Sequence, residues 1–250
     1  PALLSRAENG KLTDAGNSMS PDIERVMSLN PDAILLSPFE NAGYGRIGKM
    51  GIPIIECADY LETSPLGRAE WIKFFGLLYG KEVETDSIFT EVEKNYTELR
   101  NKIGILSSAP VVISELKSGS AWYMPGGKSY MARFFKDAGA AYPWSDNPET
   151  GSIPLSFETV FNRAGEADIW LIKSFNVSEL SYRTLQKEYA PYARFKAFRE
   201  KKIYGCDSSR CNYYEETPFR PDLLLQELAA LFHPGLFPDY RFRYYQPLSE

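Results

Sequence analysis

Aromatic and cationic side chains follow the predicted strands of this chain, in the loops where each strand ends. In the first part of the chain these residues are Phe39, Tyr44, Arg46 and Tyr60. In the later part they are Lys117, Trp122, Tyr123, Lys173 and Phe175. Ligands of open α/β sheets bind outside the carboxyl ends of the strands, and a large ring buries about 150–250 Å². The pattern predicts a site for a bulky planar or aromatic ligand with acidic groups.

One further segment, residues 210–220, concentrates aromatic, acidic and basic residues in a loop. Its candidate ligand contacts are Arg210, Tyr213, Tyr214 and Glu215. Binding residues are frequent on such loops, since a rigid scaffold can position them there. We therefore add these four residues to the predicted ligand site.

Catalytic and metal-binding patterns are sparse. The single histidine, His233, ends an apolar helical stretch, where it fits a helix cap better than a general base. Cys206 and Cys211 are five positions apart and are interpreted either as a disulfide or as two unpaired thiols. No second cysteine pair or nearby histidine completes a ligand set. We predict no catalytic residue, no metal site and no cofactor.

The run Gly126-Gly127-Lys128-Ser129 looks at first like a phosphate loop. The Walker pattern needs another glycine five positions before its Gly-Lys pair, and that position holds Trp122. Two interpretations stay open. The turn either binds an anion weakly through backbone N–H groups or simply joins a strand to a helix.

The elements that must position these residues occur in two copies of one pattern. The run around Glu24 leads to Asp32, an apolar stretch and Phe39, and the run around Glu158 leads to Asp168, a second apolar stretch and Phe175. Each copy predicts a short amphipathic helix, a turn, a buried parallel strand and a loop with an aromatic residue. The fold class is therefore α/β, with two lobes and a ligand cleft between them.

A charged helical stretch separates the two copies. We place the N-terminal lobe at residues 1–80, a connecting helix at 81–106 and the C-terminal lobe, with its terminal helix, at 107–250. About 22 residues of helix span roughly 33 Å, the width of a small domain. A single long helix is thus predicted to join the lobes.

Composition excludes two classes of partner. The 250 residues carry a formal net charge of −5, so no general cationic surface exists for nucleic acid. No apolar run approaches the roughly 18–20 residues that a transmembrane helix needs. We predict a globular protein without a nucleic-acid partner or a transmembrane segment.

Several segments together resemble a known family. They are NPDAILLSPFENAGYGRIGKMGIPIIECADYLETSPLGRAEWIKFFGLLYGK, SGSAWYMPGGKSYMARFFKDAGAAYPW, PLSFETVFNRAGEADIWLI and PFRPDLLLQELAALFHPGLFPD. Their order is similar to the helical-backbone class of periplasmic substrate-binding proteins of ABC importers. The resemblance covers the chain from about Ser20 onward. The family usually has another strand and helix before the segment that starts at Pro1, so the first lobe is expected to lack them.

The resemblance implies a function in the envelope. Proteins of this family capture iron siderophores, haem or cobalamin and deliver them to the membrane permease, from the periplasm or cell envelope and often as processed lipoproteins. It also implies one acidic docking residue on each lobe, for which Glu40 and Glu179 stand at the matching positions. The metal arrives already wrapped in its chelator, which agrees with the lack of metal-ligand clusters.

Two other functions compete with this one. A hydrolytic or chelate-processing enzyme would use Asp207, Glu215 or Glu216 as acid or base. A protein-interaction module would use the aromatic loops as a docking patch. The sequence does not select among siderophore, haem and cobalamin, because the choice depends on where a few rings and charges lie in space.

Overall fold

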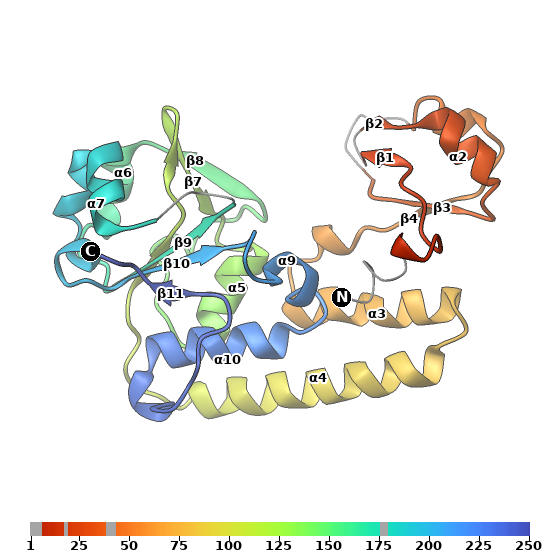
Figure 1. The fold of residues 1–250 in the computed structure, drawn as a ribbon. Helices are drawn as coiled ribbons and strands as arrows, with labels where there is room; N and C mark the ends of the chain where they lie inside the picture. The colour runs from red at the N-terminus through yellow and green to blue at the C-terminus, as the bar shows by residue number, and fades with distance from the viewer. Residues whose placement is uncertain (1–6, 18–19, 39–43, 176–179) are drawn as a thin grey trace. The chain divides into compact units, whose positions relative to one another are not determined.

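The computed structural model of the chain describes residues 7–17, 20–38, 44–175 and 180–250 (Figure 1). Contacts divide the chain into two compact units, Pro1–Leu61 and Glu62–Glu250. The sequence pattern predicts the end of the first lobe at residue 80, whereas the first compact unit ends at Leu61. The reason is that helix α3 (Pro65–Leu78) packs along helix α4 (Glu82–Ile103) within the second unit. A long helix, α4, is present within residues 81–106, and its role as a connector of two lobes stays a prediction.

The first unit is small and contains a parallel pair of strands. Strand β3 (Ile34–Leu36) pairs with β4 (Ile54–Glu56). Helix α2 (Ile23–Leu29) precedes β3; the Asp22 side chain caps its first turn, and Asn30 ends it in the left-handed conformation. The short helix predicted around Glu24 is therefore present in the structure. The remaining elements are β1 (Gly16–Asn17), β2 (Ser20–Pro21), η1 (Ile47–Lys49) and η2 (Asp59–Leu61).

The second unit is built on a four-stranded sheet. Strands β5 (Val112–Ser114), β9 (Ile169–Ser174) and β10 (Ile203–Asp207) are parallel, and β11 (Gln246–Pro247) pairs antiparallel with β10. Residues 169–172 of β9 are all buried. A strand covered on both faces is apolar along its length, which is why β9 could be predicted from a continuous apolar run.

A second, antiparallel sheet lies between β5 and α6 in the chain and was not predicted. Strand β7 (Ala121–Pro125) pairs with β6 (Lys117–Ser118) on one side and with β8 (Ser152–Leu155) on the other. The β6–β7 turn contains Gly119, whose φ of 58° lies in the left-handed region that favours glycine.

Helices cover both faces of the parallel sheet (Figure 1). Helix α5 (Tyr130–Asp137) and helix α10 (Pro221–Phe232) lie on one side, with α4 packed against α10. Helix α6 (Phe157–Ala164) and helix α7 (Tyr182–Glu188) lie on the other. The short helices are η3 (Ala190–Arg194), α8 (Lys196–Arg199), α9 (Tyr213–Glu216) and η4 (Pro234–Leu236).

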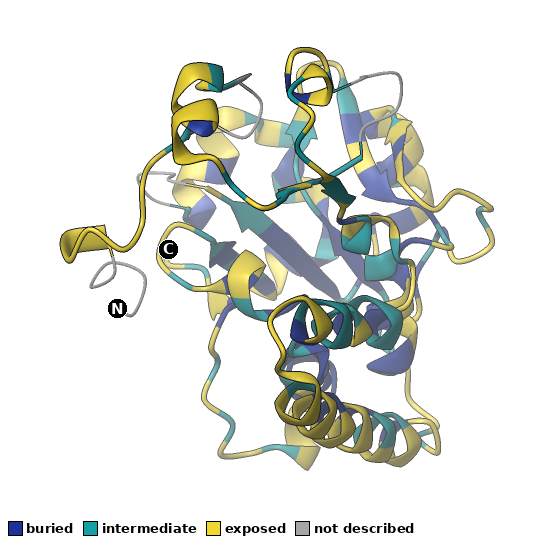
Figure 2. Cartoon of the chain, turned by 90° about the vertical axis from the view of Figure 1, so that its right-hand side faces the viewer, coloured by how far each residue is buried: buried dark blue, intermediate teal, exposed yellow. Residues whose placement is uncertain are grey.

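The core of the second unit is rich in rings. Trp122 and Trp170 pack against each other and against Tyr192 and Phe195, with ring centroids 5.2–5.7 Å apart. All four side chains are almost completely buried, and Figure 2 shows buried strands in the interior of this unit. Rings of this size dominate the burial of apolar surface.

Asp168, the aspartate of the second copy of the doubled pattern, ties β5 to β9. Its carboxylate accepts a hydrogen bond from the backbone N–H of Val111 at 2.8 Å and pairs with Lys196 Nζ at 2.5 Å. Burial acts to raise the pKa of Asp168, but the bonds from Lys196 and Val111 outweigh it, and the pKa is lowered. The turn aspartate therefore aligns the starts of neighbouring parallel strands.

Candidate ligand-binding site

A cavity of about 660 Å³ lies in the second unit, beside the carboxyl ends of β5 and β9. We call it the Lys173 cavity. Its volume is within the range of about 300–1,000 Å³ that is usual for small-molecule sites. The charged and aromatic side chains among its lining residues are Glu115, Lys117, Tyr123, Tyr130, Lys173 and Glu188.

An ion pair joins the two strand ends at this cavity. Lys173 Nζ contacts a carboxylate oxygen of Glu115, and the two side chains are only 16% and 24% exposed. Burial acts to lower the pKa of Lys173, but the negative charge of Glu115 more than compensates, so the pKa is raised. Lys173 is therefore a cation held in place by its partner.

Glu115 itself has an unusual backbone conformation. Its φ of 64° lies in the left-handed region, which costs a non-glycine residue about 1–3 kcal/mol. The peptide groups around it are held firmly: its N–H donates to Leu171 O at 2.8 Å, and its carbonyl accepts from the indole N–H of Trp170 at 2.8 Å. Backbone strain of this kind is frequent at binding sites, where the surrounding structure maintains it.

The rings of the cavity come from different elements. Tyr123 on β7 is 50% exposed, and Tyr130 begins α5. The Tyr130 hydroxyl donates to Thr217 O at 3.3 Å, and its ring packs edge-on against Phe134 at 5.0 Å. The Nζ atom of Lys117 lies 5.2 Å from the ring centroid of Tyr189. The cavity thus offers one restrained ring, one more exposed ring and charges of both signs.

Metal ligands are lacking in the part of the chain that the structure describes. Within it, no three histidine, cysteine, aspartate or glutamate side chains lie close enough together to hold a metal ion. The single histidine, His233, is buried and lies 3.2 Å from the carbonyl oxygen of Ala138 through Nε2. The Lys173 cavity can supply ring contacts, hydrogen bonds and ionic contacts to a guest.

Comparison with known proteins identifies the family to which this architecture belongs. A sequence model described as periplasmic binding protein matches residues 2–209. The chain belongs to the periplasmic binding protein family. An uncharacterized lipoprotein of Methanocaldococcus jannaschii is 31% identical over 239 residues, which is 91% of this chain and 54% of the relative. A petrobactin-binding protein of Bacillus subtilis is 25% identical over 116 residues, 45% of this chain and 35% of that protein.

Solved structures agree with this periplasmic binding protein fold. Staphylococcus aureus IsdE complexed with haem matches with a TM-score of 0.67 and 20% identity, covering 88% of this chain and 83% of that chain. The predicted family and α/β class are therefore confirmed. The chain spans about half the length of the lipoprotein relative (54%). Among the described residues, no helix is both long and apolar enough to cross a membrane.

Three residues predicted for the ligand site line the Lys173 cavity of this periplasmic binding protein. They are Lys117, Tyr123 and Lys173. They come from three separate strands, β6, β7 and β9. The rule that ligand contacts follow strand ends had selected all three. Their role in binding stays a prediction.

Two predicted contacts are instead core residues. Trp122 is fully buried, and its indole N–H donates to Ser114 O at 3.0 Å. Tyr213 is 4% exposed, its hydroxyl lies 3.6 Å from Met131 Sδ, and burial raises its pKa well above the ordinary value. Neither side chain is open to a ligand, because each ring fills the interior of the second unit.

The other predicted contacts lie outside the Lys173 cavity. Phe175, Tyr214 and Glu215 are exposed residues that do not line it. In the first unit, the hydroxyl of Tyr44 donates to Glu56, that of Tyr60 donates to Pro38 O, and Arg46 is exposed. Phe39, Glu40 and Glu179 lie outside the described residues.

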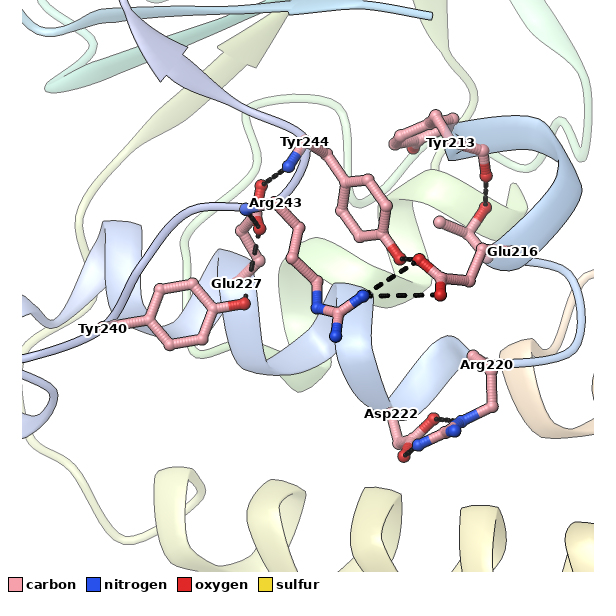
Figure 3. Close-up of polar contacts among 9 residues, drawn as sticks. Tyr213, Glu216, Arg220, Asp222, Glu227, Tyr240, Arg243 and Tyr244 are labelled. Carbon is pink, nitrogen blue, oxygen red and sulfur yellow. Dashed lines mark hydrogen bonds and ion pairs between the residues drawn. The ribbon is translucent and has the colours of Figure 1, made fainter. Parts of the chain in front are cut away.

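Arg210 lines a different cavity, of about 390 Å³, together with Asp207, Arg243 and Tyr244. Arg210 pairs with Asp207 at 3.4 Å. Glu216 accepts a hydrogen bond from the Tyr244 hydroxyl at 2.6 Å and pairs with Arg243 at 3.3 Å (Figure 3).

Three carboxylates were candidates for an enzymatic role. Asp207 is held by Arg210, Glu216 is held by Tyr244 and Arg243, and Glu215 is exposed. Two of them thus have ionic partners, and none lines the Lys173 cavity. Their arrangement gives no support to an acid–base pair.

Cys206 and Cys211 are free thiols with their sulfur atoms 3.7 Å apart. A disulfide bond requires about 2.05 Å. Burial raises the pKa of both thiols. Of the two interpretations of the sequence, the structure has the unpaired thiols, placed close enough for oxidation to join them.

Sequence reasoning missed three charged or aromatic residues of the Lys173 cavity. Glu115 directly follows β5, so the strand-end rule applied one residue earlier would have found it. Tyr130 begins the helix after the glycine-rich turn. Glu188 ends α7, and no signal in the sequence connects it with the strands.

Proposed function

We propose that this chain is the substrate-binding component of an ABC importer, which captures an iron chelate (a siderophore or haem) or cobalamin and delivers it to the membrane permease. We place it in the periplasm or cell envelope, as a processed lipoprotein. Family membership supports the importer role. The lipoprotein relative supports lipoprotein processing, and the petrobactin-binding relative and the haem-bound similar structure support an iron-chelate or haem ligand. Glu40 and Glu179 remain the proposed contacts with the permease.

The observation that carries the proposal is the chemistry of the Lys173 cavity. It combines ring surface from Tyr123 and Tyr130 with the cations Lys117 and Lys173, without a metal-ligand cluster among the described residues. Such a site suits a guest whose metal is already coordinated. The rings would pack on the flat or aromatic parts of the guest, and the lysines would contact its acidic groups.

The proposal is tested by titrating the purified chain with haem, a ferric siderophore and cobalamin. Tryptophan fluorescence reports binding, because Trp170 donates a hydrogen bond to Glu115 at the cavity. We expect saturable binding of at least one compound, recovered chemically unchanged. No response to any of them contradicts the proposal, and conversion of the compound favours a chelate-processing enzyme.

A matched pair of variants then tests the location of the site. Tyr123→Ala removes a ring that lines the cavity, and Tyr79→Ala removes a ring that is 70% exposed at the end of α3. A lost ring contact is worth about 0.5–1.5 kcal/mol beyond its area, so Tyr123→Ala is expected to weaken binding at least about threefold. Tyr79→Ala is expected to leave affinity unchanged. Equal effects would place the ligand elsewhere.

A further inference from the structure

A second cavity of about 660 Å³ in the second unit has a strongly cationic lining. It is lined by Lys128, Arg133 and Lys136 and by the hydroxyl-bearing residues Ser64, Ser129 and Ser145. We call it the Lys128 cavity. None of the described residues that line it is an aspartate or glutamate. A cavity with three cations is unexpected in a chain with a net charge of −5.

The excess charge belongs mainly to the two lysines. Arg133 Nε donates to both carboxylate oxygens of Asp137, at 3.1 and 2.9 Å. Asp137 is buried and also accepts a hydrogen bond from the Tyr96 hydroxyl at 2.8 Å. Asp137 therefore balances Arg133, whereas Lys128 and Lys136 are exposed at the cavity and leave it positive.

Two backbone N–H groups of the glycine-rich turn beside this cavity already donate hydrogen bonds within the chain. The N–H of Lys128 donates to Glu149 O at 3.0 Å, and that of Ser129 donates to Gly126 O at 3.0 Å. A side chain at Gly127 would come within 2.4 Å of Trp144 O, so packing requires this glycine. Of the two interpretations of Gly126–Ser129, the connecting turn is thus the better one for the backbone. The anion site proposed below therefore uses side-chain donors.

We propose that the Lys128 cavity binds an organic oxyanion with at least two negative charges, of the phosphate or carboxylate class. Lysine ammonium groups and serine hydroxyls are donors that such oxyanions accept. The volume is in the range of small-molecule sites. The site is separate from the Lys173 cavity, with Ser129 lining both. The proposal does not rest on the function proposed above.

The test uses the whole chain at low ionic strength. Inorganic pyrophosphate and citrate are titrated by calorimetry, and vesicles of phosphatidylcholine with and without phosphatidylglycerol are tested by flotation. Saturable binding of either soluble anion, weakened by added salt, supports a soluble ligand. Binding only to the anionic vesicles, with the variant dependence below, supports the same site with a lipid headgroup as ligand.

The deciding variants are two matched pairs of lysines. Lys128→Gln with Lys136→Gln removes both excess charges, and Lys94→Gln with Lys187→Gln removes the same total charge at exposed positions outside the cavity. We expect the first pair to weaken binding at least about tenfold and the second less than about twofold.

Arg133 is left intact, because its removal would leave Asp137 buried without its ion-pair partner. Thermal unfolding of both double variants shows whether they fold like the parent chain. Equal weakening by both pairs, or no binding to any of the probes, overturns the proposal.

Discussion

Replacing Glu227 by glutamine should destabilise the second unit markedly. Glu227 on α10 is completely buried, and its carboxylate accepts four hydrogen bonds from the C-terminal segment. Three donors are the N–H groups of Arg243 at 2.6 Å and Tyr244 at 2.9 Å and the Tyr240 hydroxyl at 3.3 Å (Figure 3). The fourth is the N–H group of Tyr245 at 2.6 Å. A single side chain thus anchors the segment that brings Arg243 and Tyr244 to their cavity.

The size of the effect follows from these four bonds. In its best orientation, the glutamine NH₂ replaces the oxygen that faces Arg243 and Tyr240. The tyrosine hydroxyl can turn to accept, but the Arg243 N–H loses its acceptor, at a cost of about 1–3 kcal/mol. The two remaining backbone bonds change from charge-assisted to neutral and lose about 1 kcal/mol each. Relief of the buried charge offsets part of this, so we expect a net loss of about 2–4 kcal/mol.

Urea unfolding followed by tryptophan fluorescence measures this loss. Trp71, Trp122, Trp144 and Trp170 all lie in the second unit, so the signal reports that unit. Glu98→Gln, at an exposed position on α4, is the matched control and should change the free energy of unfolding by less than about 0.5 kcal/mol. A Glu227→Gln variant as stable as this control would refute the anchoring role.

The pH dependence of the free energy of unfolding tests the contribution of Glu227 independently. Burial raises the pKa of Glu227, and the hydrogen bonds that it accepts only partly oppose this. The folded chain then binds this proton more tightly than the unfolded chain does. The contribution of Glu227 to stability is therefore largest below the unfolded pKa of about 4.3 and falls as the pH rises through the folded pKa. The stability difference between the parent chain and Glu227→Gln should accordingly shrink from about pH 4.5 to neutral pH.

Two further predictions concern the second unit. Because the pKa of Asp168 is lowered by folding, its stabilising effect is present above about pH 3.9 and is lost as the pH falls through the folded value. Asp168→Asn should thus lower the urea midpoint at neutral pH, by a small amount because solvent screens the pair, and match the parent chain in acid. Mild oxidation with a diazene should join Cys206 to Cys211, so that denatured protein titrates with one thiol instead of three. Three thiols after oxidation, or the same loss in Cys211→Ser, would contradict this.

Much of the fold could be predicted from local patterns. The amphipathic run around Glu24 and the continuous apolar run of β9 are local signals, and the structure has the expected helix and strand at these places. The antiparallel sheet of β6, β7 and β8 was missed. Its strands lie in a segment rich in glycine and serine, and β6 has only two residues, too few for a periodic pattern to be visible.

The candidate site was harder to predict, because being next to a strand end in sequence does not decide which way a side chain faces. Trp122 and Tyr123 are neighbours on β7 and were predicted as equivalent contacts. Successive side chains of a strand point to opposite faces, so only one of the two can face the cavity. Trp122 is completely buried, and Tyr123 is half exposed and lines the cavity.

The choice between these two rings is made by packing across the sheet. The Trp122 ring packs against two rings of the core, Trp170 on β9 and Tyr192 on η3. The centroid distances are 5.4 Å to Trp170 and 5.7 Å to Tyr192. Its N–H also satisfies the carbonyl of Ser114 at the end of β5. The sequence has no periodic signal for these contacts, because they join residues from four separate elements. Packing of Trp122 in the core thus fixes which face of β7 is buried, and Tyr123, on the opposite face, lines the cavity.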